Sequence, residues 1–89
     1  VNLVLKKNLI TNNLAYWGGG IEISRSNLIL VGNTIKKNHA YLIGGGLSLV
    51  FNSSVEFDEN ILNDIYLNYA GKGNDIYRSF NCLPINVIL

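Results

Sequence analysis

The chain has 89 residues and a mass of 9.8 kDa, which is enough for one small domain or a piece of a larger one. Its formal net charge is +1 and only 15% of its residues are charged, which argues against nucleic acid as a partner. A hydrophobic fraction of 48% excludes a disordered chain, and no apolar run is long enough for a transmembrane helix. The single cysteine, Cys82, excludes a disulfide framework.

Asparagine and glycine dominate the polar part of the composition. The chain contains fourteen Asn and nine Gly, but no Met and no Gln. Asn and Gly disfavour the interior of helices, so this composition predicts an all-β fold. Because the chain has no Met, we expect it to be a fragment of a longer protein.

In chain order, short apolar segments at 3–5, 8–10 and 21–23 come first, and the last of them follows Gly18–Gly20. The same parts return at 28–30, 33–35 and 47–49, after Gly44–Gly46. A third set lies at 55–57, 60–62 and 75–77, where Gly73-Asn74-Asp75 stands in place of the triple glycine. Alternating apolar residues bounded by Asn, Gly and Ser indicate strands.

Three short strands that repeat every 25–27 residues predict a parallel β-helix, a solenoid of about three stacked coils. We place the coils at 2–26, 27–53 and 54–79 of a single segment, 1–89, with 80–89 as the start of a further coil or an end strand. An antiparallel β-sandwich would explain the strand spacing, but not the regular return of Asn and Gly. A leucine-rich repeat lacks the glycine triplet.

Stacked coils should align equivalent residues. The inward columns that we expect are Leu5/Leu30/Phe57, Ile10/Ile35/Leu62 and Ile23/Leu49/Ile76. Asn8, Asn33 and Asn60 should form an asparagine ladder with hydrogen bonds from coil to coil, and Asn13 and Asn38 a second, shorter one. The triplets Gly18, Gly19, Gly20 and Gly44, Gly45, Gly46 should lie where the backbone turns or takes a positive φ.

Two segments, Asn13-Leu14-Ala15-Tyr16-Trp17-Gly18-Gly19-Gly20-Ile21 and its counterpart at 38–47, resemble the repeats of right-handed parallel β-helices in bacterial surface proteins. They are most similar to the polymorphic outer-membrane protein repeats of autotransporter passengers. Residues 73–77 look like a variant of that repeat. The resemblance covers residues 2–78 and implies a right-handed coil at the bacterial cell surface, in the outer membrane or outside the cell. It does not specify a function, because lyases, glycosidases, adhesins and tailspikes share such coils.

Few residues are candidates for catalysis. We expect Glu22, Ser48 and Asp75 in one outward column, which would bring Glu22 and Asp75 to within about 10 Å of each other. Inverting glycosidases need a similar separation, although outward charges on strands are commonly just solvated. His39 has no second His and no Cys or Ser motif nearby, which argues against a catalytic triad or a zinc site. No metal and no cofactor are expected.

Tyr16, Trp17 and Tyr41 precede the glycines of consecutive coils, and Tyr66 and Tyr69 fall nearby in the third. Aromatic rings along a coil edge could stack on sugar rings, or they could pack against a neighbouring segment. These residues are the candidate ligand-binding site.

The sequence favours a structural or adhesive segment, without catalysis of its own, in a secreted or cell-surface β-helix protein. The alternative is part of a polysaccharide-degrading β-helix enzyme, a lyase or a glycoside hydrolase. The expected partners are neighbouring coils of the parent protein and a polysaccharide or host-surface molecule. We see no polar cap at either end of the segment, so we expect the isolated chain to be marginally stable or to aggregate.

Overall fold

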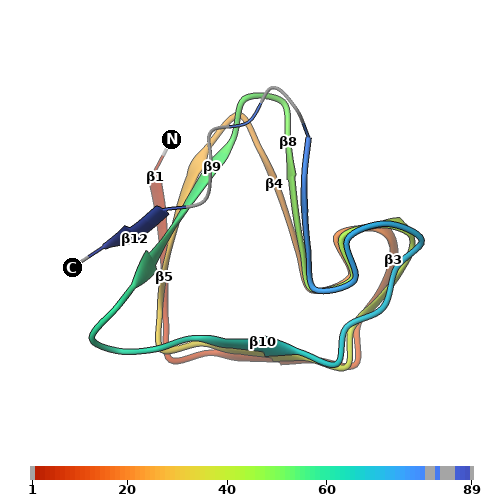
Figure 1. Ribbon diagram of the computed structural model, residues 1–89. Helices are drawn as coiled ribbons and strands as arrows, with labels where there is room; N and C mark the ends of the chain where they lie inside the picture. The colour runs from red at the N-terminus through yellow and green to blue at the C-terminus, as the bar shows by residue number, and fades with distance from the viewer. Residues whose placement is uncertain (1, 80–81, 83–85, 89) are drawn as a thin grey trace.

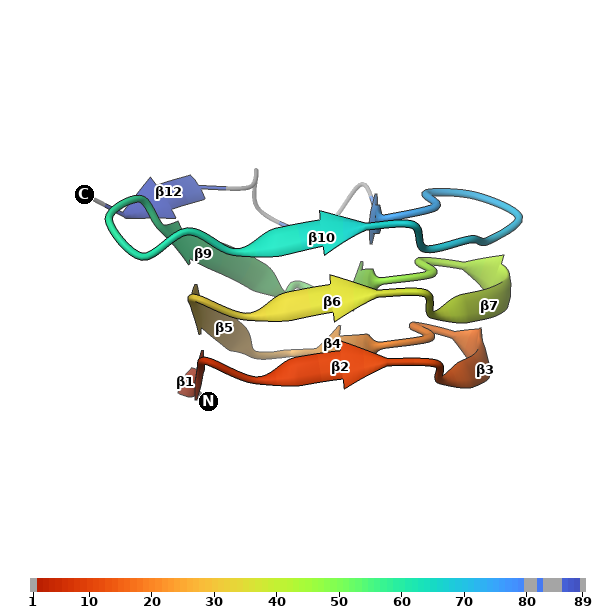
Figure 2. The same ribbon diagram turned by 90° about the horizontal axis from the view of Figure 1, so that it is seen from below.

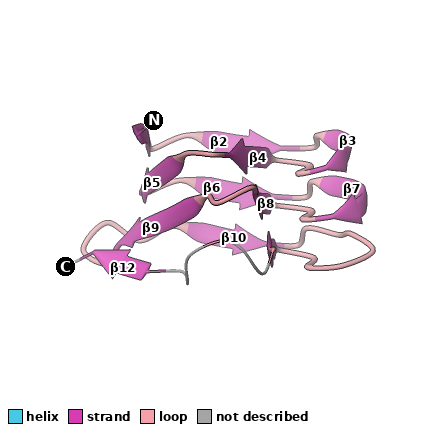
Figure 3. Ribbon diagram, turned by 90° about the horizontal axis from the view of Figure 1, so that it is seen from above, coloured by secondary structure: helices cyan, strands magenta, loops and turns pink. Residues whose placement is uncertain are grey.

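A computed structural model of the chain describes residues 2–79, 82 and 86–88, and all its regular elements are β-strands. The strands form four parallel sheets in which each strand pairs with its counterpart one coil later. Viewed along the stack, the coils superimpose as a closed, roughly triangular path (Figure 1). Seen from the side, they lie as layers one above another (Figures 2 and 3). The predicted parallel β-helix of about three coils is confirmed. No helix in this described part of the chain is long and apolar enough to cross a membrane.

The four sheets have the following members. The first contains β1 (Asn2–Lys6), β5 (Asn27–Val31), β9 (Ser54–Asp58) and β12 (Asn86–Ile88). The second contains β2 (Leu9–Thr11), β6 (Thr34–Lys36) and β10 (Asp64–Tyr66). The third contains β4 (Ile21–Ser24), β8 (Leu47–Val50) and β11 (Ile76–Arg78), and the fourth pairs β3 (Leu14–Trp17) with β7 (His39–Ile43).

The fourth sheet belongs to a lobe that projects from the triangle between the second and third sheets (Figure 1). We use "the lobe" for residues 14–20 of the first coil, 39–46 of the second and 69–75 of the third. In the third coil an extended loop replaces the strand. Two isolated bridges, His39–Tyr69 and Ile43–Lys72, and further main-chain hydrogen bonds join it to the second coil.

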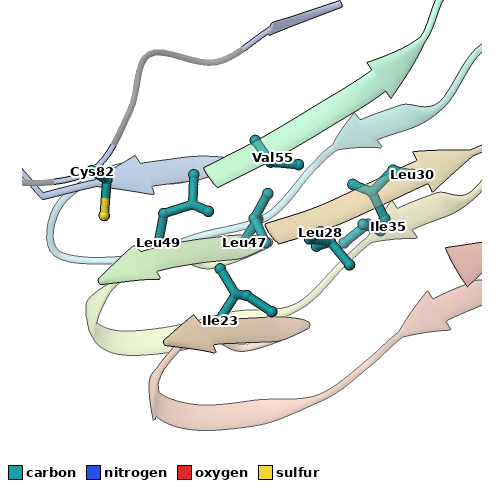
Figure 4. Packing of buried hydrophobic residues seen from close by; sticks show 8 residues of the cluster. All are labelled: Ile23, Leu28, Leu30, Ile35, Leu47, Leu49, Val55 and Cys82. Carbon is teal, nitrogen blue, oxygen red and sulfur yellow. The ribbon is translucent and has the colours of Figure 1, made fainter. Parts of the chain in front are cut away.

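The hydrophobic core lies mainly in the middle coil. Leu28, Leu30, Ile35, Leu47 and Leu49 of that coil have no exposed surface. Ile23 below them and Val55 and Cys82 above complete the cluster (Figure 4). Cys82 is therefore a small buried core residue. The middle coil has the densest core because it has a neighbour on both sides.

Two asparagine ladders run along the stack, but the third coil joins them at other residues than predicted. The backbone N–H and Nδ2 of Asn8 donate to Oδ1 of Asn33, at 2.9 and 3.0 Å. Those of Asn33 donate in turn to Oδ1 of Asn63, at 2.7 and 3.1 Å. Asn60 was therefore wrongly assigned to the first ladder. It is exposed, and its backbone N–H is bound by Oδ1 of Asp58.

The second ladder extends further than predicted. Nδ2 of Asn13 donates to Asn38, and Nδ2 of Asn38 donates to Asn68, each at 3.0 Å. The expectation that this ladder has no member in the third coil is wrong, because Asn68 takes that place. Asn38 and Asn68 are buried, and each also donates to a main-chain carbonyl of the preceding coil, Ile10 O and Ile35 O respectively.

The cause of the misassignment is an insertion in the third coil. Successive ladder residues are 25 apart between the first two coils and 30 apart between the second and third. The third coil therefore exceeds the predicted 25–27 residues. The β9–β10 loop (residues 59–63) bulges outward at one corner (Figure 1), and Gly32 N donates to Ile61 O across it. Ile65 pairs with Ile35 in the inward column, whereas Leu62, which was expected there, is 72% exposed.

The inward column of the first sheet is as predicted, because Leu5, Leu30 and Phe57 align. In the third sheet, a shift in register changes the predicted column. Ile76 pairs with Leu47, and Arg78 pairs with Leu49. The predicted Ile23/Leu49/Ile76 column is thus replaced by Ile23/Leu49/Arg78 and Ile21/Leu47/Ile76.

Part of the expected further coil lies within the described residues. β12 runs parallel to β9, with Val87 opposite Phe57, so a fourth layer begins in the first sheet. The rest of the 80–89 prediction, apart from Cys82, lies outside the described residues.

Candidate functional site

The lobe carries an exposed aromatic surface, which is the best candidate for a binding site. Tyr16 is 70% exposed, and the side chains of Trp17, Tyr41 and Tyr69 are about half exposed. Leu14 and Leu42 add exposed apolar surface to the same strands. Large apolar side chains that gather at one place on a surface commonly mark a contact site.

Backbone pairing brings the rings of successive coils together. Ala15 lies opposite Ala40, which is fully buried, so the strand residues on either side of these alanines face outward. The ring centroids of Tyr16 and Tyr41 are 5.3 Å apart with an interplanar angle of 47°. The ring of His39 meets Tyr41 edge-on at 5.4 Å.

The predicted aromatic set is thus brought together only in part. Trp17 pairs with Ile43 beyond a register shift, and among the described residues it makes no ring contact with the tyrosines. Tyr69 of the third coil lies in the column of Leu14 and His39, and not in that of Tyr16 and Tyr41. Tyr66 does not belong to the lobe, because it lies on β10 with Lys36 over its ring at 5.9 Å.

The glycine triplets position the lobe, and their members have two different roles. Gly18, Gly44 and Gly73 have φ between +61° and +64°, a region that favours glycine. A Cβ at Gly44 would lie 2.7 Å from Leu47 O, so the chain can re-enter the sheet here only without a side chain. Gly19 and Gly45 instead allow a close approach between coils. A Cβ at Gly19 would lie 2.5 Å from Gly45 O, and a Cβ at Gly45 would lie 2.4 Å from Asn74 O.

Ser48 lies beneath this turn. Glu22 is exposed, as predicted for a residue of the outward column. Ser48, which was predicted in the same column, has no exposed surface. Its Oγ is buried without a hydrogen-bond partner among the described residues. Unlike Glu22, Ser48 has a paired strand on both sides, because β8 lies between β4 and β11.

The two carboxylates considered for catalysis do not share a column. Tyr77, and not Asp75, pairs with Ser48 and continues the Glu22 column. Asp75 is instead occupied by the second ladder, where its Oδ1 accepts the backbone N–H and Nδ2 of Asn68, both at 3.1 Å. The distance argument for a glycosidase pair therefore no longer applies.

A second surface feature is an open depression of about 330 Å³ beside the β9–β10 loop. It is lined by Phe57, Asp58, Glu59, Leu62 and Asn63. The Asp58 carboxylate is already bound to the backbone N–H groups of Asn60 and Ile61. Within the described residues no group of three or more His, Cys, Asp or Glu side chains could hold a metal ion.

The sequence offered signals for the lobe but few for its third coil. Tyr16 and Tyr41 could be found because they precede identical glycine triplets, whereas Tyr69 precedes a triplet of which only Gly73 remains. Asn68 was missed because the insertion in the third coil places it 30 residues after Asn38. Compared with known protein families, with curated proteins and with solved structures, the chain has no match in any of the three.

Proposed function

We propose that this chain is a structural and adhesive segment of a secreted or cell-surface β-helix protein, similar to the passenger repeats of bacterial autotransporters. The ladders and the aliphatic core keep the coils stiff, and the lobe presents the contact surface. The stack works as a spacer, because each added coil lengthens the rod.

One observation carries the adhesive part of the proposal: exposed rings of successive coils lie along one edge of the lobe. Tyr16 and Tyr41 are in contact at 5.3 Å, the ring of His39 meets Tyr41 edge-on, and Tyr69 of the third coil is the bridge partner of His39. Amphipathic rings that remain exposed suit a ligand with both apolar faces and hydroxyl groups, and a sugar chain has both. We therefore propose a polysaccharide as the ligand.

The test is binding of the full chain to a panel of polysaccharides, measured by calorimetry, with Tyr16→Ala and Tyr41→Ala variants in parallel. Trp17→Ala tests whether this residue, which lies apart from the ring contact, contributes. Tyr66→Ala is the matched control, because Tyr66 is also an exposed tyrosine on a strand but lies outside the lobe. Binding that is lost with Tyr16 or Tyr41 and retained without Tyr66 supports the proposal. Absence of binding to a folded chain, or equal loss in all variants, would contradict it.

The same samples address the alternative of a polysaccharide-degrading enzyme. Incubation with each bound polysaccharide, followed by measurement of newly formed reducing ends, would detect cleavage. Glu22→Gln is the variant to compare, since Glu22 is exposed on β4 next to the lobe. The adhesive proposal expects no release of reducing ends and no effect of Glu22→Gln.

A further inference from the structure

The lobe ends differently in the third coil from the way it passes through the first two. Main-chain hydrogen bonds align the glycine triplet of the second coil with Gly73, Asn74 and Asp75: Gly46 N donates to Asn74 O, at 3.1 Å, and Leu47 N to Asp75 O, at 2.9 Å. Asn74 and Asp75 thus occupy the positions of Gly45 and Gly46. Two of the three glycines have been replaced by residues with polar side chains.

The Asn74 and Asp75 side chains accept hydrogen bonds from two backbone N–H groups of the third coil. The equivalent N–H groups of the second coil bond to the coil that follows. The N–H of Asn38 donates to Oδ1 of Asn68 in the following coil, and the N–H of Ala40 donates to Tyr69 O, also one coil later. In the third coil the N–H of Asn68 donates to Oδ1 of Asp75, at 3.1 Å. The N–H of Ala70 donates to Oδ1 of Asn74, at 2.9 Å.

The Asn74 and Asp75 side chains also stand where a following coil would have to pack. A Cβ at Gly45 would lie 2.4 Å from Asn74 O and 2.5 Å from Tyr69 O. A Cβ at Gly46 would lie 2.6 Å from Asp75 O and 2.8 Å from Nδ2 of the ladder residue Asn68. Coils therefore stack at the lobe only when the lower one has glycine at both positions, and the third coil has glycine at neither.

We propose that Asn74 and Asp75 form a cap that closes the lobe to any further coil of the same kind. The cap excludes a fourth layer that carries a glycine loop and a ladder asparagine at this corner. The closure is local. β12 adds a fourth layer to the first sheet, and among the described residues no side chain caps the backbone N–H of Asn63 in the way that Asp75 caps Asn68. This inference does not depend on what the lobe binds.

The test uses the 89-residue chain and a chain extended by one coil, in which a second copy of residues 33–53 follows Leu89. Val87 has the register of Leu30, so the copied Asn33 falls three residues later, as it does in the second coil. Asn74→Gly with Asp75→Gly restores the glycine triplet in both chains. Stability is measured by urea unfolding.

We expect the paired substitution to destabilise the 89-residue chain and to stabilise the extended chain. In the 89-residue chain it leaves the N–H groups of Asn68 and Ala70 without acceptors and lowers the folding equilibrium constant about tenfold. In the extended chain it admits the new coil and raises that constant by a similar factor. Asp75→Asn is the matched control. It keeps an acceptor and a Cβ, so it should preserve the 89-residue chain and still exclude the added coil.

Amide hydrogen exchange provides a second readout that needs no extended chain. The backbone N–H of Asn68 should exchange as slowly as that of Asn38 in the unmodified protein and rapidly in the paired variant. The proposal is overturned if the paired substitution shifts the stability of both chains in the same direction. It is also overturned if Asn68 exchange is the same with and without Asn74 and Asp75.

Discussion

Each ladder asparagine of the middle coil, Asn33 and Asn38, bonds to both neighbouring coils at once. Oδ1 of Asn38 accepts two N–H groups from Asn13, and its Nδ2 donates to Ile10 O and to Oδ1 of Asn68. An apolar side chain cannot make these hydrogen bonds. The backbone at the corner turns out of the sheets, so its N–H and C=O groups have no partner in a neighbouring strand. The recurrence of Asn in the sequence is therefore a direct consequence of the fold.

We expect Asn38→Ala to lower the free energy of unfolding by about 3 kcal/mol, since it leaves several buried groups unpaired. Asn60→Ala is the control and should change that free energy by less than about 0.5 kcal/mol, because its side chain is exposed in the β9–β10 loop. Urea unfolding of both variants checks the prediction. Equal effects of the two substitutions would contradict the assignment of the ladders.

Ser48 presents the opposite situation, a buried polar group without a partner. Its Oγ has no hydrogen bond among the described residues, and an unpaired buried hydroxyl destabilises the folded state. Ser48→Ala should therefore raise the free energy of unfolding by about 1 kcal/mol. Ser24→Ala, on an exposed position of β4, should leave it unchanged. A loss of stability in Ser48→Ala would show that the hydroxyl is bonded.

At the scale of elements, the sequence predicted the strands well where the repeat is regular and poorly where it is not. The first two coils share their glycine triplets and both asparagines, so every ladder residue in them was placed correctly. In the third coil, Phe57-x-x-Asn60 imitates the spacing of Leu30-x-x-Asn33, although Asn63 is the residue that bonds to Asn33. Local spacing could not reveal this, because the choice depends on the hydrogen bond to the preceding coil.

The cap of the lobe was missed for a related physical reason. In the sequence, Asn74 and Asp75 read as an imperfect glycine triplet, and no polar cap was expected. Only the space around Gly45 and Gly46 shows that a side chain at these positions excludes a following coil. The aromatic surface was easier to predict, because alternation along a strand determines which residues face outward.

The β9–β10 loop makes a prediction at this scale. Deleting residues 60–62 restores the three-residue spacing between Phe57 and the ladder residue Asn63. The change in the free energy of unfolding should stay within about 1 kcal/mol, because shortening a surface loop alters closure entropy only slightly. The exposed side chains of Ile61 and Leu62 are removed as well, which should reduce aggregation. Urea unfolding and light scattering measure the two effects, and loss of cooperative unfolding would contradict the loop's peripheral role.

For the whole molecule, burial is distributed unevenly among the coils. Six apolar side chains of the middle coil have no exposed surface, whereas Leu3, the first-coil counterpart of Leu28, is 44% exposed. The strands β1, β2, β3 and β4 also have a pairing partner on one side only. Unpaired strand edges with apolar side chains favour association, which is consistent with the expected marginal stability of the isolated chain.

This gradient predicts the order in which the molecule opens. Backbone amides of β5, β6 and β8 should exchange most slowly, because they lie between two coils and over the densest core. Amides of β1 and β2 should exchange at least tenfold faster, since the first coil has a paired coil on one side and, of the described residues, contributes to the buried cluster with Ile23 alone. Hydrogen exchange followed by NMR on the full chain gives both rates directly. Equal protection in all coils would mean that the stack unfolds as one cooperative unit, and the middle coil would then not be the centre of its stability.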